Sequence, residues 1–406
     1  MEVGEYIISM ARKARAASAE LARMDTAAKN AALLAVADAL EARRAEIDAA
    51  NREDVEKARA SGLAPAMVDR LTLTPARFDA MVSGVRRVVE LPDPVGERMW
   101  TRERPSGIRI EKVRVPFGVV AVVFESRPNV FVDTAALCLK TGNAVILRGG
   151  KEALGTNAAL AAAVGSALAP LGAGDAVQLV GITDHAAVTE LVRAVGLVDV
   201  AIPRGGERLI RAMCEAALVP VLKHYKGVCH VYVDKAADQS MALAILDNAK
   251  TQRPGVCNAA ECLLVHEGVA GEFMPKVRAW AEEKGVVLHF DASTPEEWGR
   301  EFLALEMNVG VVRDCRAAVE HINAYGSHHS DCIVTADAEC AEEFLRDVDS
   351  AAVYHNASTR FTDGGEFGMG AEIGISTDKL HARGPMGLEE LTTYKYRVTG
   401  DGTVRK

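Results

Sequence analysis

The stretch Val119-Val-Ala-Val-Val-Phe124 opens a region in which short apolar runs alternate with helical segments. The alternation continues through the runs Ala144–Leu147, Val177–Val180, Val198–Ile202 and Val219–Leu222. A short apolar run between turn signals is typical of a strand that is buried on both faces. Strands that alternate with helices form parallel sheets with right-handed crossovers. The region therefore predicts an α/β domain with a doubly wound sheet, a type of domain that binds nucleotides.

The residues on either side of this region predict further parts of the chain. Residues 1–90 carry apolar side chains at helical spacing and predict helices. Residues 100–115 alternate polar and apolar side chains around a Pro-Ser-Gly turn, which is typical of an exposed β-hairpin, and residues 391–404 alternate in the same way. The expected helix Met241–Thr251 and strand Cys262–His266 begin a second α/β pattern. The length of 406 residues also favours more than one domain, because single cores stop growing at roughly 250–300 residues.

The composition excludes several classes of protein. The chain has 47 Lys and Arg against 56 Asp and Glu and a net charge of -9, without the clustered positive charge that nucleic acid requires. The most apolar stretch, Ala158–Leu171, is interrupted by Gly165 and Pro170, so it predicts a core helix and not a membrane span. Eight cysteines in so long a chain indicate no disulfide framework. We therefore expect a cytoplasmic protein that acts without nucleic acid or membrane.

Two glycine turns follow expected strands of the first domain. The dinucleotide fingerprint G-x-G-x-x-G is absent, but Arg204-Gly-Gly206 precedes a helix that begins at Glu207, and Arg148-Gly-Gly150 follows an earlier strand. Glycines before a helix let an anion approach unpaired backbone N–H groups, and each arginine adds positive charge. The turns predict anion binding, although ordinary glycine turns would have the same sequence.

Cys257 is the cysteine best placed for chemistry. Pro254 and Gly255 must end the preceding helix, so Cys257 is expected on a loop before the next strand, where nucleophiles are often found. Arg253 and Lys250 are near in sequence and would favour the reactive thiolate. The alternative is a buried structural thiol.

The histidines do not predict a metal site. His328 and His329 are adjacent and Asp331 is close, but neighbouring histidines rarely face one ion. The sequence contains no C-x-x-C pair and no H-E-x-x-H motif. We therefore expect no metal.

Long, specific motifs occur between about residue 113 and the C-terminus. They are residues 116–120 (PFGVV), 125–129 (ESRPN), 142–150 (GNAVILRGG), 202–206 (IPRGG), 248–260 (NAKTQRPGVCNAA), 325–331 (YGSHHSD), 357–368 (ASTRFTDGGEFG) and 381–387 (HARGPMG). With these motifs the chain resembles the γ-glutamyl phosphate reductases, also called glutamate-5-semialdehyde dehydrogenases, of the aldehyde dehydrogenase superfamily.

The resemblance implies an α/β fold of the aldehyde dehydrogenase type, with two doubly wound parallel-sheet domains and a bridging β-hairpin for oligomerisation. It implies a cofactor-binding domain at residues 1–235, with the hairpin at about 97–115, a catalytic domain at 236–370, and a return segment with a bridging tail at 371–406. We accordingly expect a homo-oligomer, a dimer or tetramer, with glutamate 5-kinase as a candidate partner.

The resemblance also assigns roles to individual residues. Cys257 is the implied nucleophile, and Arg127 or Asn129 falls near the place of the superfamily's oxyanion asparagine. His224 falls where the superfamily has the glutamate that activates water. The implied cofactor-binding residues are Arg148, Gly149, Arg204, Gly205, Gly206 and Glu306. The residues expected to make charge-assisted contacts with an anionic substrate are Lys250, Arg253 and Arg360.

The implied reaction is the NADPH-dependent reduction of γ-glutamyl 5-phosphate to glutamate 5-semialdehyde and phosphate, the second step of proline biosynthesis. Cys257 would attack the acyl carbon and form a thioester, which hydride from the cofactor then reduces. The sequence does not decide whether the enzyme prefers NADPH or NADH. Two alternatives are a cysteine acyl transferase or hydrolase that uses no nicotinamide, and a non-catalytic oligomerising scaffold. The intact Cys257 and the intact glycine turns argue against the scaffold.

Overall fold

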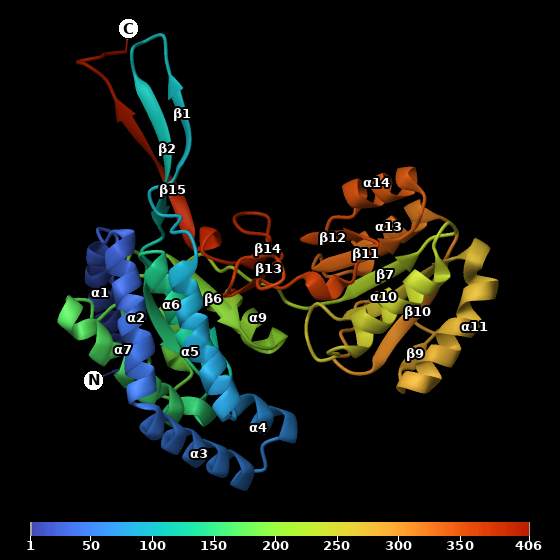
Figure 1. The fold of residues 1–406 in the computed structure, drawn as a ribbon, viewed down its shortest axis with the longest axis horizontal. Coiled ribbons are helices and arrows are strands. Elements are labelled where there is room, and N and C mark those ends of the chain that lie inside the picture. Colours follow the sequence, from blue (N-terminus) through green and yellow to red (C-terminus); the bar gives the residue numbers. More distant parts are fainter. Residues whose placement is uncertain (1, 406) are drawn as a thin grey trace. The chain divides into compact units, whose positions relative to one another are not determined.

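The computed structural model describes residues 2–405, and the chain divides into two compact units (Figure 1). The first unit comprises Met1–Leu222, Gly368–Gly374 and Met386–Lys406. The second comprises Lys223–Phe367 and Ile375–Pro385. The long N-terminal part of the first unit therefore ends before the expected boundary at residue 235, and the C-terminal residues contribute to both units. The functional names of the two domains stay predictions.

A four-stranded parallel sheet forms the centre of the first unit. Its strands follow the order β5 (Val177–Leu179), β4 (Ala144–Arg148), β3 (Val119–Phe124) and β6 (Val200–Arg204). Every residue of β3 and β4 is buried, as expected for strands that are covered on both faces. The parallel α/β fold predicted from this stretch of sequence is confirmed.

Helices cover both faces of this sheet. The connections through α6 and α7 run in one direction along the sheet and the connection through α8 runs in the other, so right-handed crossovers place α8 on the opposite face, where it packs against α1. The helices are α1 (Val3–Leu21), α2 (Thr26–Ala42), α3 (Arg44–Ala60), α4 (Pro65–Leu71), α5 (Pro75–Glu90), α6 (Asn129–Lys140), α7 (Leu154–Leu168), α8 (Ala186–Val192) and α9 (Glu207–Ala216), with the 3₁₀ turns η1 (Lys151–Ala153), η2 (Ala169–Leu171) and η4 (Glu389–Leu391).

The segment around α7 has one property that requires explanation. Among residues 2–405, Lys151–Leu171 is the one helical segment long and apolar enough to cross a membrane, by length and composition only. Leu160, Val164 and Leu168 of α7 are buried, and the helix packs against α2 and α3. This packing is that of a core helix.

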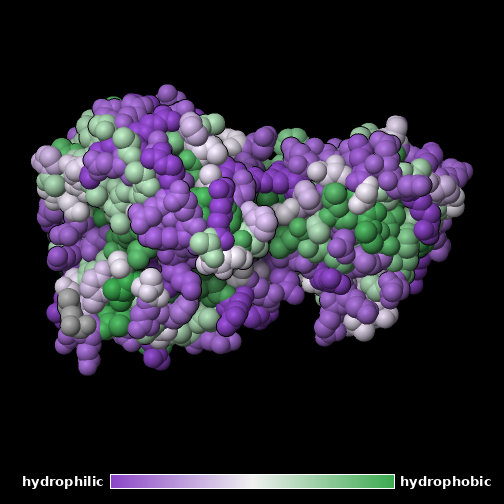
Figure 2. Space-filling view, turned by 90° about the horizontal axis from the view of Figure 1, so that it is seen from below, coloured by the Kyte–Doolittle hydropathy of each residue, from purple (hydrophilic) through white to green (hydrophobic). Residues whose placement is uncertain are grey.

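Polar side chains cover most of the face drawn in Figure 2, and apolar side chains gather there in separate patches.

A three-stranded antiparallel sheet projects from the first unit (Figure 1). Its strands are β1 (Arg98–Glu103), β2 (Arg109–Pro116) and β15 (Thr392–Thr399), with β2 in the middle. The sheet confirms the hairpin and the strand-like tail that the alternation of side chains predicts. Its exposed apolar and aromatic residues include Met99, Tyr394, Tyr396 and Val398.

A six-stranded parallel sheet forms the centre of the second unit. Its order is β12 (Ala352–His355), β11 (Ser330–Val334), β7 (Cys229–Val233), β8 (Ala260–His266), β10 (Glu306–Val312) and β9 (Val287–His289). The helices of this unit are α10 (Gln239–Thr251), α11 (Glu267–Lys284), α12 (Pro295–Trp298), α13 (Cys315–Tyr325) and α14 (Ala338–Asp347), with the 3₁₀ turn η3 (Thr359–Phe361). A separate pair, β13 (Gly374–Ser376) and β14 (Gly384–Met386), completes the strands.

Candidate active site

Cys257 lies on the loop between α10 and β8, as the sequence predicts. The helix ends at Thr251, Pro254 and Gly255 turn the chain, and the half-buried Cys257 follows. The carbonyl oxygen of Cys257 accepts a hydrogen bond from Cys229 Sγ at 3.2 Å. This bond joins the loop to the first residue of β7.

Gly227 packs directly against the backbone of this loop. A Cβ atom at Gly227 would overlap the carbonyl group and the Cα atom of Cys257. The Gly227 N–H donates a hydrogen bond to Glu301 Oε1 at 2.9 Å, which fixes the segment at this close approach. Only glycine fits at this position without a shift of the backbone that carries the thiol.

Two imidazole rings lie beside Cys257. His224, His329 and Cys257 each place one ligand atom in a group whose members lie within 4.8 Å of one another. The two rings meet edge to face, with their centroids 5.5 Å apart. Burial, with a contribution from His224, lowers the pKa of His329 to about 3. A ring with so low a pKa is neutral near pH 7.

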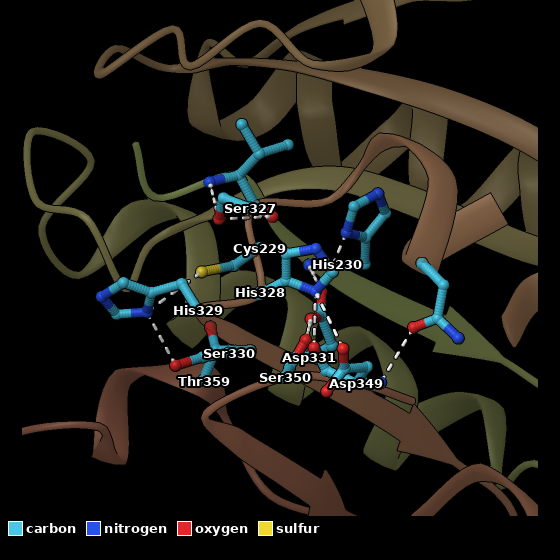
Figure 3. Close-up of polar contacts among 12 residues, drawn as sticks. Cys229, His230, Ser327, His328, His329, Ser330, Asp331, Asp349, Ser350 and Thr359 are labelled. Atoms are coloured by element: carbon cyan, nitrogen blue, oxygen red, sulfur yellow. Dashed lines mark hydrogen bonds and ion pairs between the residues drawn. The ribbon is translucent and has the colours of Figure 1, made fainter. Parts of the chain in front are cut away.

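A chain of hydrogen bonds holds the ring of His329 in place. Figure 3 shows His329 with its Nδ1 atom directed at Ser330 and Cys229; the distance from Nδ1 to Ser330 Oγ is 2.9 Å. Ser330 Oγ is 2.6 Å from Thr362 Oγ1, which is 2.7 Å from the hydroxyl of Tyr354. This chain of hydrogen bonds fixes the orientation of the His329 ring.

A buried ion pair joins the two elements on either side of the Cys257 loop. Lys250 Nζ, at the end of α10, lies 2.8 Å from Glu261 Oε2 in β8, and both side chains are fully buried. Glu261 lies where the register of β7 against β8 shifts, a β-bulge that turns its carboxylate toward the helix. Burial lowers the pKa of Lys250 and raises the pKa of Glu261 to about 7. The expected contact between Lys250 and the substrate gains no support from this position, because Lys250 Nζ is already bound to Glu261.

Two arginines of the predicted substrate site lie near the thiol. Arg360 Nε donates to Gln252 Oε1 at 2.9 Å, and Arg360 Nη1 donates to Asn258 Oδ1, the side chain of the residue after Cys257. Burial and the neighbouring Arg253 lower the pKa of Arg360, whereas attraction by Cys257 acts in the opposite direction. The structure thus brings Arg253, Arg360 and Cys257 together within the second unit.

The predicted cofactor residues of the first unit lie at the carboxyl edge of its sheet. Arg148 ends β4, and its Nη2 donates to Thr183 O at 3.3 Å while burial lowers its pKa. Arg204 ends β6, and the N–H of Gly206, just before α9, donates to Glu125 Oε1 at 2.8 Å. Ligands of α/β domains bind outside this edge of the sheet. A carboxylate therefore already lies at the helix start that the sequence assigns to an anion.

Two of the remaining predicted residues, Asn129 and Glu306, have polar partners within their own units. Asn129 Nδ2, in the first turn of α6, donates to Asp133 Oδ2 at 2.9 Å, and Arg127 lies just before this helix. Glu306, at the start of β10 in the second unit, lies 3.1 Å from His289 Nε2. The oxyanion role of Arg127 or Asn129 and the cofactor role of Glu306 stay predictions.

Four residues at the site have no role predicted from the sequence: Gly227, Cys229, Glu261 and His329. Cys229 and Ser330 begin two neighbouring parallel strands, and His329 precedes Ser330, so the amino ends of these strands bring the residues together. The order of strands in the sheet is needed to see this. The sequence alone therefore does not predict this cluster, because it does not show which strands are neighbours.

Comparisons with known proteins agree with this fold. The profile of the aldehyde dehydrogenase family matches residues 4–294. The chain is similar to the crystal structure of gamma-glutamyl phosphate reductase from Thermotoga maritima, with 45% identity and a TM-score of 0.96 over 98% of this chain and 100% of that chain. It is also similar to gamma-glutamyl phosphate reductase from Saccharomyces cerevisiae, with 31% identity and a TM-score of 0.56 over 98% of both chains. An acetylating aldehyde dehydrogenase from Geobacillus thermoglucosidasius is 16% identical, with a TM-score of 0.71 over 100% of this chain and 98% of that chain, a likeness of fold alone.

Proposed function

Because the chain belongs to the aldehyde dehydrogenase family, whose members are oxidoreductases, we propose that it reduces γ-glutamyl 5-phosphate to glutamate 5-semialdehyde and phosphate with NADPH, the second step of proline biosynthesis. The observation that carries the proposal is the set of groups around Cys257: two imidazoles and two guanidinium groups near one half-buried cysteine. The 45% identity to a gamma-glutamyl phosphate reductase supports the choice of substrate.

Cys257 performs the covalent step. Its thiolate attacks the acyl carbon, the bond from that carbon to the phosphate oxygen breaks, and phosphate leaves with the bonding electrons, so that a thioester remains. The positive charges of Arg253 and Arg360 favour the thiolate over the thiol. The rings of His224 and His329 lie beside the sulfur atom.

Arg253 and Arg360 also fit the anionic end of the substrate. The departing group is a phosphate dianion, and a guanidinium group binds phosphate through two parallel hydrogen bonds. Arg360 is held by Gln252 and Asn258, so it loses little side-chain freedom when it binds the anion. The backbone N–H of Cys257, with Arg127 or Asn129, is our candidate set of donors for the developing oxyanion.

The sheet edge of the first unit fits a nicotinamide dinucleotide. Within residues 2–405 the buried Nε of Arg148 has no hydrogen-bond partner, and a Cβ at Gly205 would lie 2.7 Å from Glu125 Oε1, so a side chain at this turn would displace the Glu125 carboxylate. The residues that would hold the cofactor are Arg148, Gly149, Arg204, Gly205 and Gly206, and the cofactor supplies the hydride when bound.

We also infer a homo-oligomer, a dimer or tetramer, formed through the projecting sheet β1–β2–β15. The exposed Met99, Tyr394, Tyr396 and Val398 are the kind of side chains that subunit interfaces cover. Glutamate 5-kinase, which makes the acyl phosphate, is a candidate partner, and the cytoplasm is the expected compartment.

A reductase assay tests the proposal directly. γ-Glutamyl phosphate is generated enzymatically in the cuvette, and oxidation of NADPH and of NADH is followed in parallel. We expect turnover with NADPH. Phosphate release without oxidation of either nicotinamide would favour the acyl transferase or hydrolase, and binding of neither cofactor nor acyl phosphate would favour the non-catalytic scaffold.

A further inference from the structure

The group of His224, His329 and Cys257 has the composition of a metal site. Two ring nitrogens and one sulfur lie within 4.8 Å of one another, and the three residues come from separate parts of the second unit. His224 precedes β7, Cys257 lies between α10 and β8, and His329 precedes β11. The pairing of His328 with His329, considered in the sequence, is not the relevant one, because the partners of His329 are distant along the chain.

The hydrogen bonds of the two rings determine which nitrogens can bind a metal. His224 Nδ1 lies 2.9 Å from the carbonyl oxygen of Ile375, which can only accept, so Nδ1 carries the proton and the lone pair of the neutral ring is on Nε2. His329 Nδ1 contacts Ser330 Oγ, and His329 Nε2 is buried with no hydrogen-bond partner among residues 2–405. A buried polar atom without a partner costs about 1–3 kcal/mol, so this nitrogen gains from a ligand.

The outer contacts of the site match those of metal-binding histidines. Such histidines usually donate their second ring N–H to a backbone carbonyl or another acceptor, which fixes the orientation of the ring. The carbonyl of Ile375 has this role for His224, and the chain Ser330, Thr362 and Tyr354 has it for His329. Both rings are therefore held before any ion arrives.

We propose that Cys257, His224 and His329 form a Zn²⁺ site that captures the nucleophile as a metal-bound thiolate. Nitrogen and sulfur ligands select zinc over magnesium or calcium, which prefer oxygen. Tetrahedral zinc at its usual bond lengths needs ligand atoms about 3.3–3.6 Å apart, so any pair at the 4.8 Å limit must close by roughly 1.2–1.5 Å. Binding replaces the thiol proton of Cys257 by the metal and releases that proton to solvent. The fourth position stays open to water.

Zinc binding would make the site reversibly inactive. This consequence rests on the proposed role of Cys257, since a thiolate held by zinc cannot attack an acyl phosphate, whereas the binding itself does not depend on that role. Zinc would protect the thiol from oxidation and alkylation and would be displaced by chelators.

A second group, formed by His230, Cys262 and His321, provides a matched control. Its ligand atoms also lie within 4.8 Å of one another. His230 and Cys262 are fully buried, however, and His230 Nδ1 is 2.8 Å from Asp331 Oδ1 (Figure 3). Only one ligand of this group, His321, is half-buried, whereas His224 and Cys257 are both half-buried in the first group, so we place zinc at Cys257 and use Cys262 as the control cysteine.

Metal binding to the full chain tests the proposal without any activity measurement. Zn²⁺ is titrated against a chromophoric chelator, and Co²⁺ is added separately to look for the thiolate-to-cobalt charge-transfer absorption. We expect one equivalent of zinc and the charge-transfer band in the unmodified protein and in Cys262→Ser. We expect Cys257→Ser to lose the band and His329→Asn to bind zinc at least tenfold more weakly, the usual effect of losing one ligand or its support.

Alkylation of the Cys257 peptide, followed by mass spectrometry, gives an independent measurement. Zn²⁺ should slow the alkylation at concentrations at which Mg²⁺ has no effect. The proposal is overturned if the unmodified protein shows no band, if Cys262→Ser loses it, or if Cys257→Ser retains it. Should His329→Asn fail to fold, as judged by circular dichroism, the cysteine variants and the alkylation rates still decide. A protein that binds zinc but lacks reductase activity would contradict the proposed function alone.

Discussion

The sulfur of Cys257 is the atom on which the proposed chemistry depends. Cys257→Ser should reduce turnover by more than about 100-fold, because a serine hydroxyl is far less ionised than a thiol at neutral pH. Folding and NADPH binding should change little, since the cofactor residues belong to the first unit. Cys214→Ser is the matched control, because Cys214 is also half-buried but lies on α9. If Cys257→Ser kept more than about a tenth of the original turnover, Cys257 would not be the nucleophile.

The close contact between Gly227 and the Cys257 backbone predicts a second effect at the residue scale. Gly227→Ala should lower kcat by about 100-fold or more, because the added methyl group displaces the backbone that carries the thiol, and small misplacements of reacting groups have effects of that size. Gly255→Ala is the control on the same loop, since the nearest atom to its new Cβ is Leu303 O at an ordinary 3.7 Å. Equal activities of the two variants, measured in the reductase assay, would contradict the assigned geometry.

The residues of the site differ in how far the sequence predicts them. Cys257 is predictable, because proline and glycine stop the helix before it and a family motif surrounds it. Arg360, more than a hundred residues later, is identified by its motif alone, and its contact with Asn258 requires the structure. Gly227 carries no local signal, and the motif that contains His329 assigns it no role, because both roles come from strand order and backbone approach. Lys250 is the opposite case: its charge suggests a ligand contact, which stays a prediction, and the structure pairs the buried Lys250 with Glu261.

At the scale of elements, the Lys250–Glu261 pair joins α10 to β8 across the catalytic loop. Lys250→Met should lower the free energy of unfolding by roughly 3–5 kcal/mol, because it leaves a buried carboxylate without its partner. The double variant Lys250→Met/Glu261→Gln should recover part of this loss, since glutamine keeps an acceptor for the N–H of Leu303. Urea denaturation provides the measurement.

The exposed pair Glu53–Lys57 on α3 is the control for this prediction. Lys57→Met should lower the free energy of unfolding far less than Lys250→Met does, because water screens exposed charges. A loss of similar size in Lys250→Met and Lys57→Met would show that the buried pair does not hold the loop.

The glycine turns at the ends of β4 and β6 predict a separate effect on cofactor binding. Replacing Arg148 or Arg204 by alanine should raise the KM for NADPH roughly tenfold or more and change kcat much less, because a charge-assisted contact made equally in the ground and transition states is lost. Arg211→Ala is the control on α9, where Arg211 pairs with Glu207 on the exposed surface. An unchanged KM for NADPH in both the Arg148 and Arg204 variants would show that these are ordinary glycine turns that do not bind the cofactor.

At the scale of the whole molecule, both α/β units are predictable from the alternation of apolar runs and helices, because buried parallel strands leave that pattern. The point at which the chain leaves the first unit is less predictable. Residues 223–235 include the apolar strand β7, and its apolar pattern resembles that of the first unit's strands, so the sequence alone does not separate it from them.

The direction of the reaction gives the last prediction, which concerns the molecule as a complete enzyme. Run in reverse, the enzyme oxidises glutamate 5-semialdehyde with NADP to the Cys257 thioester, and some acceptor must then take the acyl group. The resemblance predicts His224 at the place where the superfamily has a glutamate that activates water, and His224 Nδ1–H is bound to Ile375 O. Without a placed general base water is a poor acceptor. Phosphate, which Arg253 and Arg360 are proposed to bind, should attack instead. Formation of NADPH should therefore depend on inorganic phosphate or arsenate, with hydrolysis of the thioester only a minor side reaction.

The rate of NADPH formation is measured by absorbance in phosphate-free buffer and after each anion is added, with sulfate as the ionic-strength control. Steady formation of NADPH at full rate without either anion would show that a base activates water in this site. The assigned activity would then be that of a hydrolytic aldehyde dehydrogenase and not of a reductase.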